Sequence, residues 1–288
     1  MMAALLCETV TGRTMGELIA ARDAATSADM VELRLDGVAR CDVARALEGR
    51  SRPVIVTCRP IWEGGQFDGA EEDRRKLLGQ ALSRGAEYVD VEWRALSAGG
   101  GRGLLDGLLD ADRERTVVSS HDFDGVPADL GARAAAMRAT GAAVIKVAVA
   151  AHRLCDTLGL MEIAKGRDDA VVIGMGNSGI PTRLLASRFG SRWTYGGNAV
   201  APGQIPVANM LDDFRFRSVG PRTALYGLVT RTGVPSRMPV VLNGAFTAAG
   251  MDAVCVPLAG ADDEDVREFS QALGFAGVMK DIDAHHHV

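Results

Sequence analysis

The sequence predicts an α/β protein: a (β/α)8 TIM barrel over residues 1–220, followed by a small C-terminal α/β appendage over residues 221–288. Short apolar runs rich in β-branched residues recur about every 22 to 35 residues, and most gaps between them suit helices. Near-continuous apolar strands that alternate with helices indicate a parallel sheet covered on both faces. Eight such units in about 200 residues fit a closed barrel. An open doubly wound sheet is the structural alternative.

Eight strands are expected, each of them a short apolar run. They are Leu5–Val10, Met30–Leu35, Val54–Cys58, Tyr88–Trp93, Thr116–Ser120, Val144–Ala148, Ala170–Met175 and Arg192–Tyr195. Segments between them, such as Glu71–Ser83 and Leu130–Thr140, are rich in Ala, Leu, Arg and Lys, which favour helices.

Ionisable or polar residues stand at the carboxyl end of nearly every expected strand, whereas the preceding halves are almost purely apolar. They are Glu32, Arg34, Asp36, Arg59, Glu63, Asp90, Glu92, His121, Asp122, Lys146, Asn177 and Arg183. Barrel enzymes place their catalytic groups at that face. The asymmetry therefore predicts an enzyme.

Composition and charge narrow the class of protein. With 47% hydrophobic and 24% charged residues, the chain suits a soluble globular protein. A net charge of -5 without a long basic run argues against nucleic-acid binding. No signal peptide or membrane-spanning run is evident, and the five scattered cysteines favour reduced thiols over disulfides or a zinc site. We expect a cytoplasmic protein that binds neither nucleic acid nor membrane.

Lys146 is the strongest catalytic candidate. It is the one charge in the apolar run 142–150, where a buried ammonium is unfavourable unless it is paired or neutralised. A desolvated lysine is the usual nucleophile for imine formation with a ketone. A lysine at an edge strand or in a structural ion pair is the alternative.

His121 and Glu63 are candidates for proton transfer. His121 ends the strand before that of Lys146, where an imidazole could relay protons near neutral pH. Glu63 lies in a loop after Arg59 and before Gly64-Gly65, which would let the backbone approach a ligand. A solvent-facing turn histidine and a solvated carboxylate are the alternatives.

Two pairs of charged residues have strand spacing, so both members of each pair point to one side. They are Glu32 with Arg34 and Asp90 with Glu92. A self-satisfied ion pair inside the barrel is an alternative to a binding role for them.

The segment Gly174–Gly179 matches GxGxxG directly after an expected strand. A dinucleotide site would need an acidic residue about 20 positions further on, where the chain has none. We interpret the segment as a glycine-rich loop that opens a helix. Its N–H groups and nearby Arg183 would suit an anion such as a carboxylate.

Together these segments resemble the type I 3-dehydroquinate dehydratases, Schiff-base enzymes of the shikimate pathway. The resemblance covers about residues 5–217 in order and with similar spacing. It rests on Glu32–Asp36, Thr57–Arg59 with Glu63–Gly65, Ser120–Phe123, Lys146–Ala148, Met175–Arg183 and Ala201–Gln204.

The resemblance implies a reaction and its catalytic groups. Lys146 would form the imine with the ketone of 3-dehydroquinate, His121 would act as general acid and base, and Glu63 would orient and tune it. The product would be 3-dehydroshikimate plus water. A protonated imine is an electron sink for the charge left by proton removal, so no metal and no cofactor beyond the imine on Lys146 is implied.

The resemblance also implies substrate-binding residues. Arg183 would pair with the substrate carboxylate and Gln204 would close over it, while Glu32, Arg34 and Arg59 would bind ring hydroxyls. Two positions depart from the family: Val200 replaces a serine or threonine that would donate to the carboxylate, and Thr182 replaces serine. The partners expected are a small carboxylate substrate and, as an open option, a second copy of the chain.

From about Thr223 the chain resembles the opening of shikimate dehydrogenase, which follows the dehydratase in bifunctional plant-type proteins. Of two substrate-binding serines in that family, Ser236 has a counterpart and Met238 occupies the other position. The catalytic lysine motif and NADP-binding domain are not found. We expect no dehydrogenase activity, and packing, dimerisation or regulation remain open as roles.

Two other functions stay open. Another class I Schiff-base lyase, such as an aldolase, would also use Lys146 but would need a phosphate-binding site for a phosphorylated substrate. A weak or inactive barrel could serve as a metabolite sensor, which Val200 and the degenerate appendage would suit. Intact Lys146, His121 and Glu63 favour the dehydratase.

Overall fold

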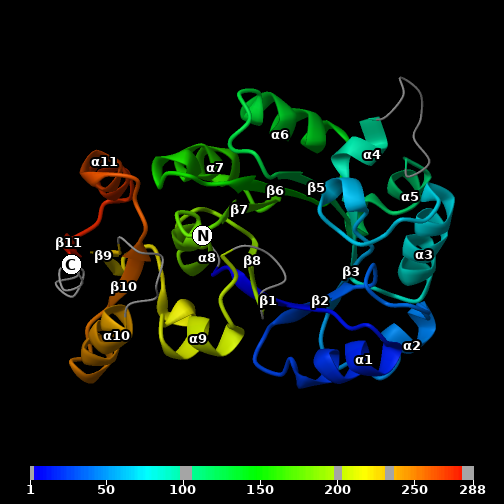
Figure 1. Ribbon diagram of the computed structural model, residues 1–288, viewed down its shortest axis with the longest axis horizontal. Coiled ribbons are helices and arrows are strands. Elements are labelled where there is room, and N and C mark those ends of the chain that lie inside the picture. Colours follow the sequence, from blue (N-terminus) through cyan, green and yellow to red (C-terminus); the bar gives the residue numbers. More distant parts are fainter. Residues whose placement is uncertain (1–2, 98–105, 198–202, 231–236, 281–288) are drawn as a thin grey trace, which may run out of the picture. The chain divides into compact units, whose positions relative to one another are not determined.

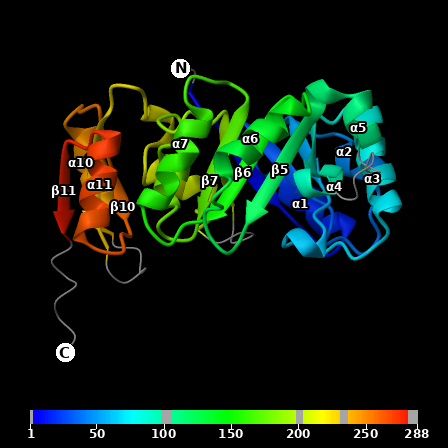
Figure 2. The same ribbon diagram turned by 90° about the horizontal axis from the view of Figure 1, so that it is seen from above.

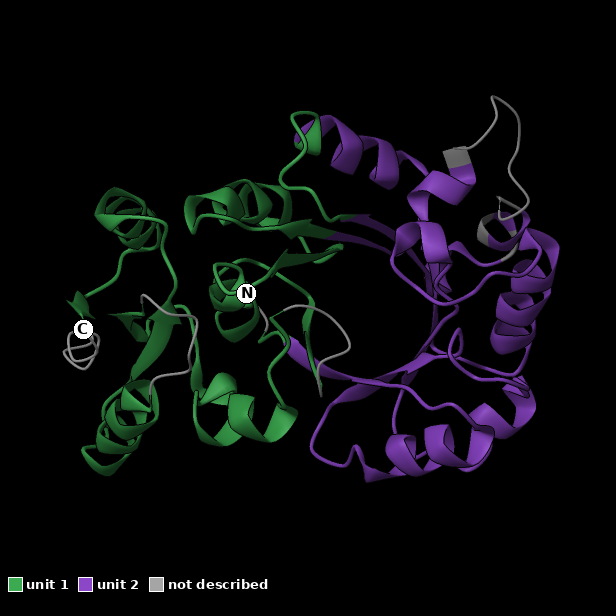
Figure 3. Cartoon of the chain, viewed as in Figure 1, with its two compact units in different colours: residues 1–4, 122–130, 148–288 green, residues 5–121, 131–147 purple. Residues whose placement is uncertain are grey.

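The computed structural model describes residues 3–97, 106–197, 203–230 and 237–280. The chain forms two compact units. Unit 1 comprises residues 1–4, 122–130 and 148–288, and unit 2 comprises residues 5–121 and 131–147 (Figure 3).

Unit 2 alternates strands and helices, with the helices outside a curved layer of strands (Figure 1). Its hydrogen-bonded strand order is β6-β5-β4-β3-β2-β1. The elements are β1 Leu5–Val10, α1 Met15–Ala24, β2 Met30–Arg34, α2 Val43–Leu47, β3 Val54–Thr57, η1 Ile61–Glu63, α3 Glu71–Ser83, β4 Tyr88–Glu92, α4 Trp93–Ser97, α5 Asp106–Ala111, η2 Arg113–Arg115, β5 Thr116–Asp122, α6 Leu130–Ala139 and β6 Val144–Ala150, the last three running to or across the boundary with unit 1.

Unit 1 continues the same alternation and then adds a three-stranded parallel sheet of order β10-β9-β11, flanked by α10 and α11 (Figure 2). Its elements are η3 Cys155–Thr157, α7 Leu158–Ala164, β7 Ala170–Met175, α8 Ile180–Leu184, β8 Trp193–Gly196, α9 Val207–Asp212, η4 Phe216–Ser218, β9 Ala224–Val229, α10 Met238–Ala248, β10 Ala253–Leu258, α11 Asp263–Leu273 and β11 Gly277–Lys280.

The predicted (β/α)8 barrel class is confirmed, as is the α/β character of the appendage. Strands β1 to β8 belong to one eight-stranded sheet, and each lies within two residues of its predicted bounds. The six strands of unit 2 pair in chain order. A doubly wound sheet would instead reverse its strand order at a switch point, so that alternative is not supported.

The strands form because they are buried on both faces. Val54, Ile55 and Val56 of β3 are fully buried, as are Val117 and Val118 of β5. The parallel pairing of β1 to β5 sets the register that brings polar side chains of neighbouring strands together.

Other expectations concern the membrane, the cysteines and metals. No helix in the described residues is long and apolar enough to cross a membrane. All five cysteines fall within the described ranges and are free thiols. Across those ranges there is no group of three or more His, Cys, Asp or Glu residues that could hold a metal ion.

Candidate active site

Lys146 lies in β6 with its amine buried between two carboxylates. Its Nζ is 3.2 Å from Asp90 Oδ2 and 3.4 Å from Glu32 Oε1. Lys146 is 5% exposed, within an otherwise apolar strand. The ion pair considered as a structural alternative is therefore present, and it places the amine among the other predicted site residues of unit 2.

Hydroxyl groups hold the Glu32 carboxylate in place. Thr9 Oγ1 on β1 donates to it at 3.2 Å, and Thr57 Oγ1 on β3 donates at 2.7 Å. Because Glu32 faces Lys146, it does not form the ion pair with Arg34 that strand spacing allowed. Arg34 instead makes a bidentate pair with Asp36, both contacts at 2.8 Å.

Arg59 follows β3 and is buried, with its hydrogen-bond acceptors on β4 and β5. It pairs with Asp90 at 3.0 Å and Glu92 at 2.7 Å, and donates to Ser119 Oγ at 2.8 Å. Burial alone raises the pKa of Asp90, but the Arg59 and Lys146 charges bring it well below its usual range. Asp90 therefore stays ionised and couples Arg59 to Lys146.

Glu63 is positioned by a tight loop that folds back on Arg59. Gly65 must be glycine, because a Cβ there would lie 2.0 Å from the Arg59 carbonyl oxygen. Gly64 takes the left-handed conformation, with φ of 77°, and ends the short helix η1. The loop thereby brings Glu63 Oε1 to His121 on β5, 2.9 Å from its backbone N and 3.2 Å from its Nδ1.

The electrostatics of the Glu63–His121 pair suit proton transfer. Burial raises the pKa of Glu63 to about 7, although Arg59 acts in the opposite direction. Burial, and then the positive charges of Arg59 and Lys146, lower the pKa of His121 well below its usual range. Near neutral pH the imidazole is neutral. With the proton on Nδ1 donated to Glu63, the lone pair is on Nε2 and can act as a base.

The other predicted binding residues belong to unit 1. Arg183 in α8 is buried, which lowers its pKa to about 10, and its Nη1 donates to Tyr195 O at 3.2 Å. Gln204 is half-buried in the segment before α9. Val200 lies outside the described residues. The Thr182 hydroxyl accepts from Gly174 N at 2.9 Å and donates to Gly179 O at 2.7 Å, so its hydrogen bonds stay within the loop.

The GxGxxG segment packs against itself. A Cβ on Gly179 would lie 2.2 Å from Gly174 C, so these glycines allow β7 to approach the start of α8. The interpretation as a glycine-rich loop that opens a helix is confirmed. The glycines serve local packing here, as they do for close helix–strand contact in other α/β folds.

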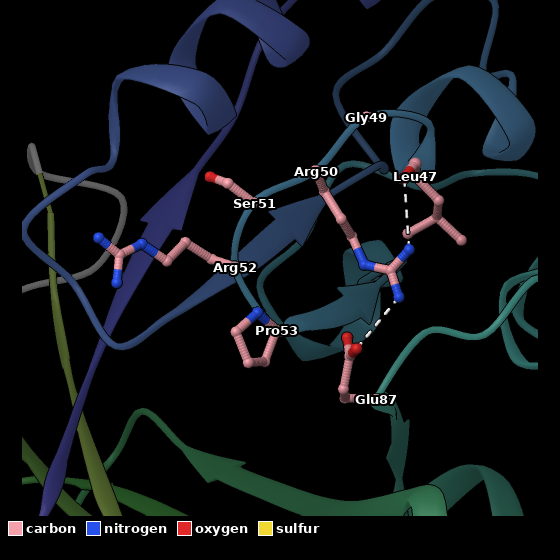
Figure 4. Close-up of a pocket in the computed structure, with 7 residues that line it drawn as sticks. All are labelled: Leu47, Gly49, Arg50, Ser51, Arg52, Pro53 and Glu87. Carbon is pink, nitrogen blue, oxygen red and sulfur yellow. Dashed lines mark hydrogen bonds and ion pairs between the residues drawn. The ribbon is translucent and has the colours of Figure 1, made fainter.

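A shallow pocket of about 470 Å³ lies in unit 2 near the amino end of β3 (Figure 4). It is lined by Leu47, Gly49, Arg50, Ser51, Arg52, Pro53 and Glu87. Arg50 pairs with Glu87 at 3.1 Å and donates to Leu47 O at 3.3 Å. The opposite ends of the strands carry the ionisable residues, so this pocket is not the candidate site.

Sequence reasoning missed two residues of the network, Arg74 and Ser119. Arg74 in α3 is fully buried, pairs with Glu92 and donates to Cys58 O at 3.2 Å. It stands in a run of charged residues typical of an exposed helix face, so the sequence holds no signal of its burial. Ser119 also donates to Asp90 at 2.5 Å, and its place on β5 two residues before His121 was the available hint.

Comparison with known proteins connects the chain to a protein family. The family model "Type I 3-dehydroquinase" matches residues 6–221. The bifunctional 3-dehydroquinate dehydratase/shikimate dehydrogenase, chloroplastic, of Arabidopsis thaliana is 32% identical over 267 residues, covering 88% of this chain but 44% of that protein. The chain thus spans under half of that relative.

Shorter relatives match over most of their length. The 3-dehydroquinate dehydratase of Methanothrix thermoacetophila is 36% identical over 210 residues, covering 72% of this chain and 88% of that protein. The crystal structure of 3-dehydroquinate dehydratase from Geobacillus kaustophilus aligns with a TM-score of 0.61 and 26% identity, over 72% of this chain and 88% of that one.

Proposed function

The chain belongs to the type I 3-dehydroquinase family, and we propose on that premise that its dehydration of 3-dehydroquinate to 3-dehydroshikimate proceeds through an imine on Lys146. The reaction is that of a lyase in the shikimate pathway. One observation carries the proposal: a buried lysine amine, held by Asp90 and Glu32, shares a unit with the Glu63–His121 pair.

The first stage forms the imine. The neutral imidazole of His121 first takes a proton from the Lys146 ammonium, and the free amine then attacks the ketone carbon so that a C–N bond forms. The ketone oxygen leaves as water, with one proton from the amine and one delivered by His121. The iminium that remains withdraws electrons from the adjacent carbon.

The second stage eliminates water. His121 Nε2 takes a proton from the carbon next to the iminium, and the C–H electron pair moves into the C–N system to give an enamine. The enamine expels the hydroxyl group on the following carbon, which receives the proton from His121 and leaves as water. Glu63 stabilises the transient imidazolium through Nδ1. Hydrolysis of the iminium then frees Lys146 and the product.

Substrate binding is assigned to four charged residues and one amide. Arg183 pairs with the substrate carboxylate and Gln204 adds a polar contact to it. Arg34, Arg59 and Glu32 bind the ring hydroxyls. Val200 offers no hydrogen bond, and a missing donor to a carboxylate weakens binding by roughly 1.5–3 kcal/mol.

Borohydride trapping tests the imine. The chain is incubated with 3-dehydroquinate, reduced, digested and analysed by mass spectrometry. We expect an adduct on the peptide that holds Lys146, retained in Lys165→Ala, whose lysine is exposed, and lost in Lys146→Ala. Circular dichroism verifies that Lys146→Ala is folded, since it leaves two buried carboxylates without this amine. A folded wild type that turns over substrate without an adduct would refute the imine.

The sensor and aldolase alternatives give different results in the same experiment. A sensor binds 3-dehydroquinate without forming product, and an aldolase releases a cleaved carbon fragment. The Glu63–His121 pair favours the dehydratase, because reversible proton transfer next to the iminium requires such a base.

We also propose that residues 221–288 are a partial shikimate dehydrogenase-like segment without that activity. The Arabidopsis match covers 88% of the chain and so extends beyond residues 6–221. Ser236, the residue that would bind substrate, lies outside the described residues, and Met238 at the other position begins α10 with its side chain exposed. NADP-dependent oxidation of shikimate is the activity to measure.

A cytoplasmic location and a homodimer are further proposals. The location is supported by the scattered cysteines, which are free thiols. Fractionation of cells that express the chain tests the location, and light scattering on the purified chain tests the dimer.

A further inference from the structure

A buried carboxylate of the appendage binds the loop after β6. Asp265 in α11 is fully buried, and its Oδ2 accepts from Leu154 N at 2.9 Å and Ala261 N at 3.0 Å. Its Oδ1 accepts from Cys155 N at 2.9 Å. Leu154 and Cys155 lie in the segment that joins β6, the strand of Lys146, to α7. The appendage therefore fixes this loop through bonds that a carboxylate makes and a neutral side chain cannot fully replace.

A second contact holds the loop after β7. Ser178 Oγ donates to Ala259 O, just after β10, at 2.6 Å and lies 3.4 Å from His152 O. Ser178 stands five residues before Arg183 in the glycine-rich loop that opens α8. The appendage thus contacts two successive loops at the carboxyl ends of barrel strands, and all of these residues belong to unit 1 (Figure 3).

These loops are packed together with the segment that carries Gln204. Ala151 N donates to Met175 O at 3.0 Å, which joins the loop after β6 to the end of β7. Gly203 has a φ of 75°, and a Cβ on it would lie 2.5 Å from Gly176 O. The residue before Gln204 therefore lies directly on the loop that the appendage holds.

We infer that the appendage is a working part of the dehydratase, because it positions the loops that present Arg183 and Gln204 to the substrate carboxylate. Asp265 and Ser178 are the positioning residues. They touch neither substrate nor reacting atoms and act through the loops. The inference rests on the proposed function, in which Arg183 and Gln204 bind that carboxylate.

Kinetics of two variants test it. Asp265→Asn removes one acceptor oxygen and places an NH2 group against backbone N–H groups, and Ser178→Ala removes the bond to Ala259. Loosened loops weaken carboxylate binding, so we expect Asp265→Asn to raise KM about tenfold and Ser178→Ala about threefold, with kcat within about twofold of wild type. Glu264→Gln, the same charge change on the exposed face of α11, should leave KM unchanged.

A double-mutant cycle separates positioning from general destabilisation. In an Arg183→Lys background, Asp265→Asn should raise KM far less than it does in wild type, because the two changes act on one interaction. Equal KM increases in both backgrounds would overturn the inference, as would a wild-type KM in both variants. If Asp265→Asn does not fold, the same cycle made with Ser178→Ala and Arg183→Lys decides alone.

The proposed function fails separately from this inference. Absence of a borohydride adduct on wild-type Lys146 refutes the imine. A wild-type adduct together with unchanged KM in Asp265→Asn and Ser178→Ala refutes only the positioning role.

Discussion

The Glu63–His121 pair combines a carboxyl whose pKa is raised to about 7 with an imidazole whose pKa is lowered. Glu63→Gln keeps an acceptor for both contacts, which go to the same oxygen, Oε1. It removes the negative charge that stabilises the imidazolium during the reaction. We therefore expect kcat to fall about 100-fold, measured across pH 5 to 9 by the appearance of the conjugated product.

The same substitution should lower kcat but raise the free energy of unfolding relative to wild type as the pH rises. Because the folded state raises the Glu63 pKa from 4.5 to about 7, the stability linked to its proton is complete below about pH 4.5 and lost as pH rises through about 7. Glu63→Gln lacks this titration. Relative to wild type it should gain on the order of 2 to 3 kcal/mol between about pH 5 and about pH 8. Urea unfolding of both proteins measures the difference, and parallel pH curves would contradict it.

At the residue scale, the sequence predicted candidates but not their partners. Lys146 and His121 were identifiable as ionisable residues in or after apolar strands. Arg74 was not, because its burial depends on how α3 packs over β4. The pairing of Arg34 with Asp36 rather than Glu32 depends on Lys146, which is distant in sequence.

Helix α3 is joined to strand β4 by a buried ion pair between Arg74 and Glu92, and Glu92 also holds Arg59. Arg74→Met would leave Glu92 with one cation in place of two. Breaking one side of a buried pair typically destabilises by about 3 to 5 kcal/mol. We expect a loss of that order in urea unfolding, with a fall in kcat/KM because Arg59 is less firmly held.

The matched control is Arg75→Met on the same helix. Arg75 is partly exposed and pairs with Glu72, so its removal should shift the unfolding midpoint little. Equal losses of unfolding free energy in Arg74→Met and Arg75→Met would mean that the buried Arg74–Glu92 pair stabilises the fold no more than an exposed pair does.

At the element scale, strands were more predictable than short helices. Strands of a parallel barrel are apolar along their whole length, and this pattern can be read locally. The predicted helix Glu71–Ser83 also agrees with α3. By contrast, η1 forms because Gly65 packs against Arg59, a tertiary contact without a local signature. Strand β5 continues to Asp122, beyond its predicted end, and so includes His121.

At the scale of the whole molecule, the appendage forms hydrogen bonds with the residues before it. The change in sequence character near residue 221 predicts a domain boundary there. Residues on both sides of that boundary belong to unit 1, in which Arg188 donates to Thr223 O and Leu273 O, both at 3.2 Å. Such contacts join residues far apart in sequence, so composition alone does not reveal them.

The appendage should lack shikimate dehydrogenase activity. Residues 221–288 contain one lysine, Lys280, which is mostly exposed and pairs with Asp263 at 2.9 Å. An exposed, ion-paired lysine is poorly placed to act as a catalytic acid or base, since catalytic lysines are generally tuned by burial. With purified chain, shikimate and NADP, absorbance at the NADPH band should not rise above the rate without enzyme, while the same preparation dehydrates 3-dehydroquinate. NADPH formation that disappears in Lys280→Ala would show instead that the appendage is a second catalytic site.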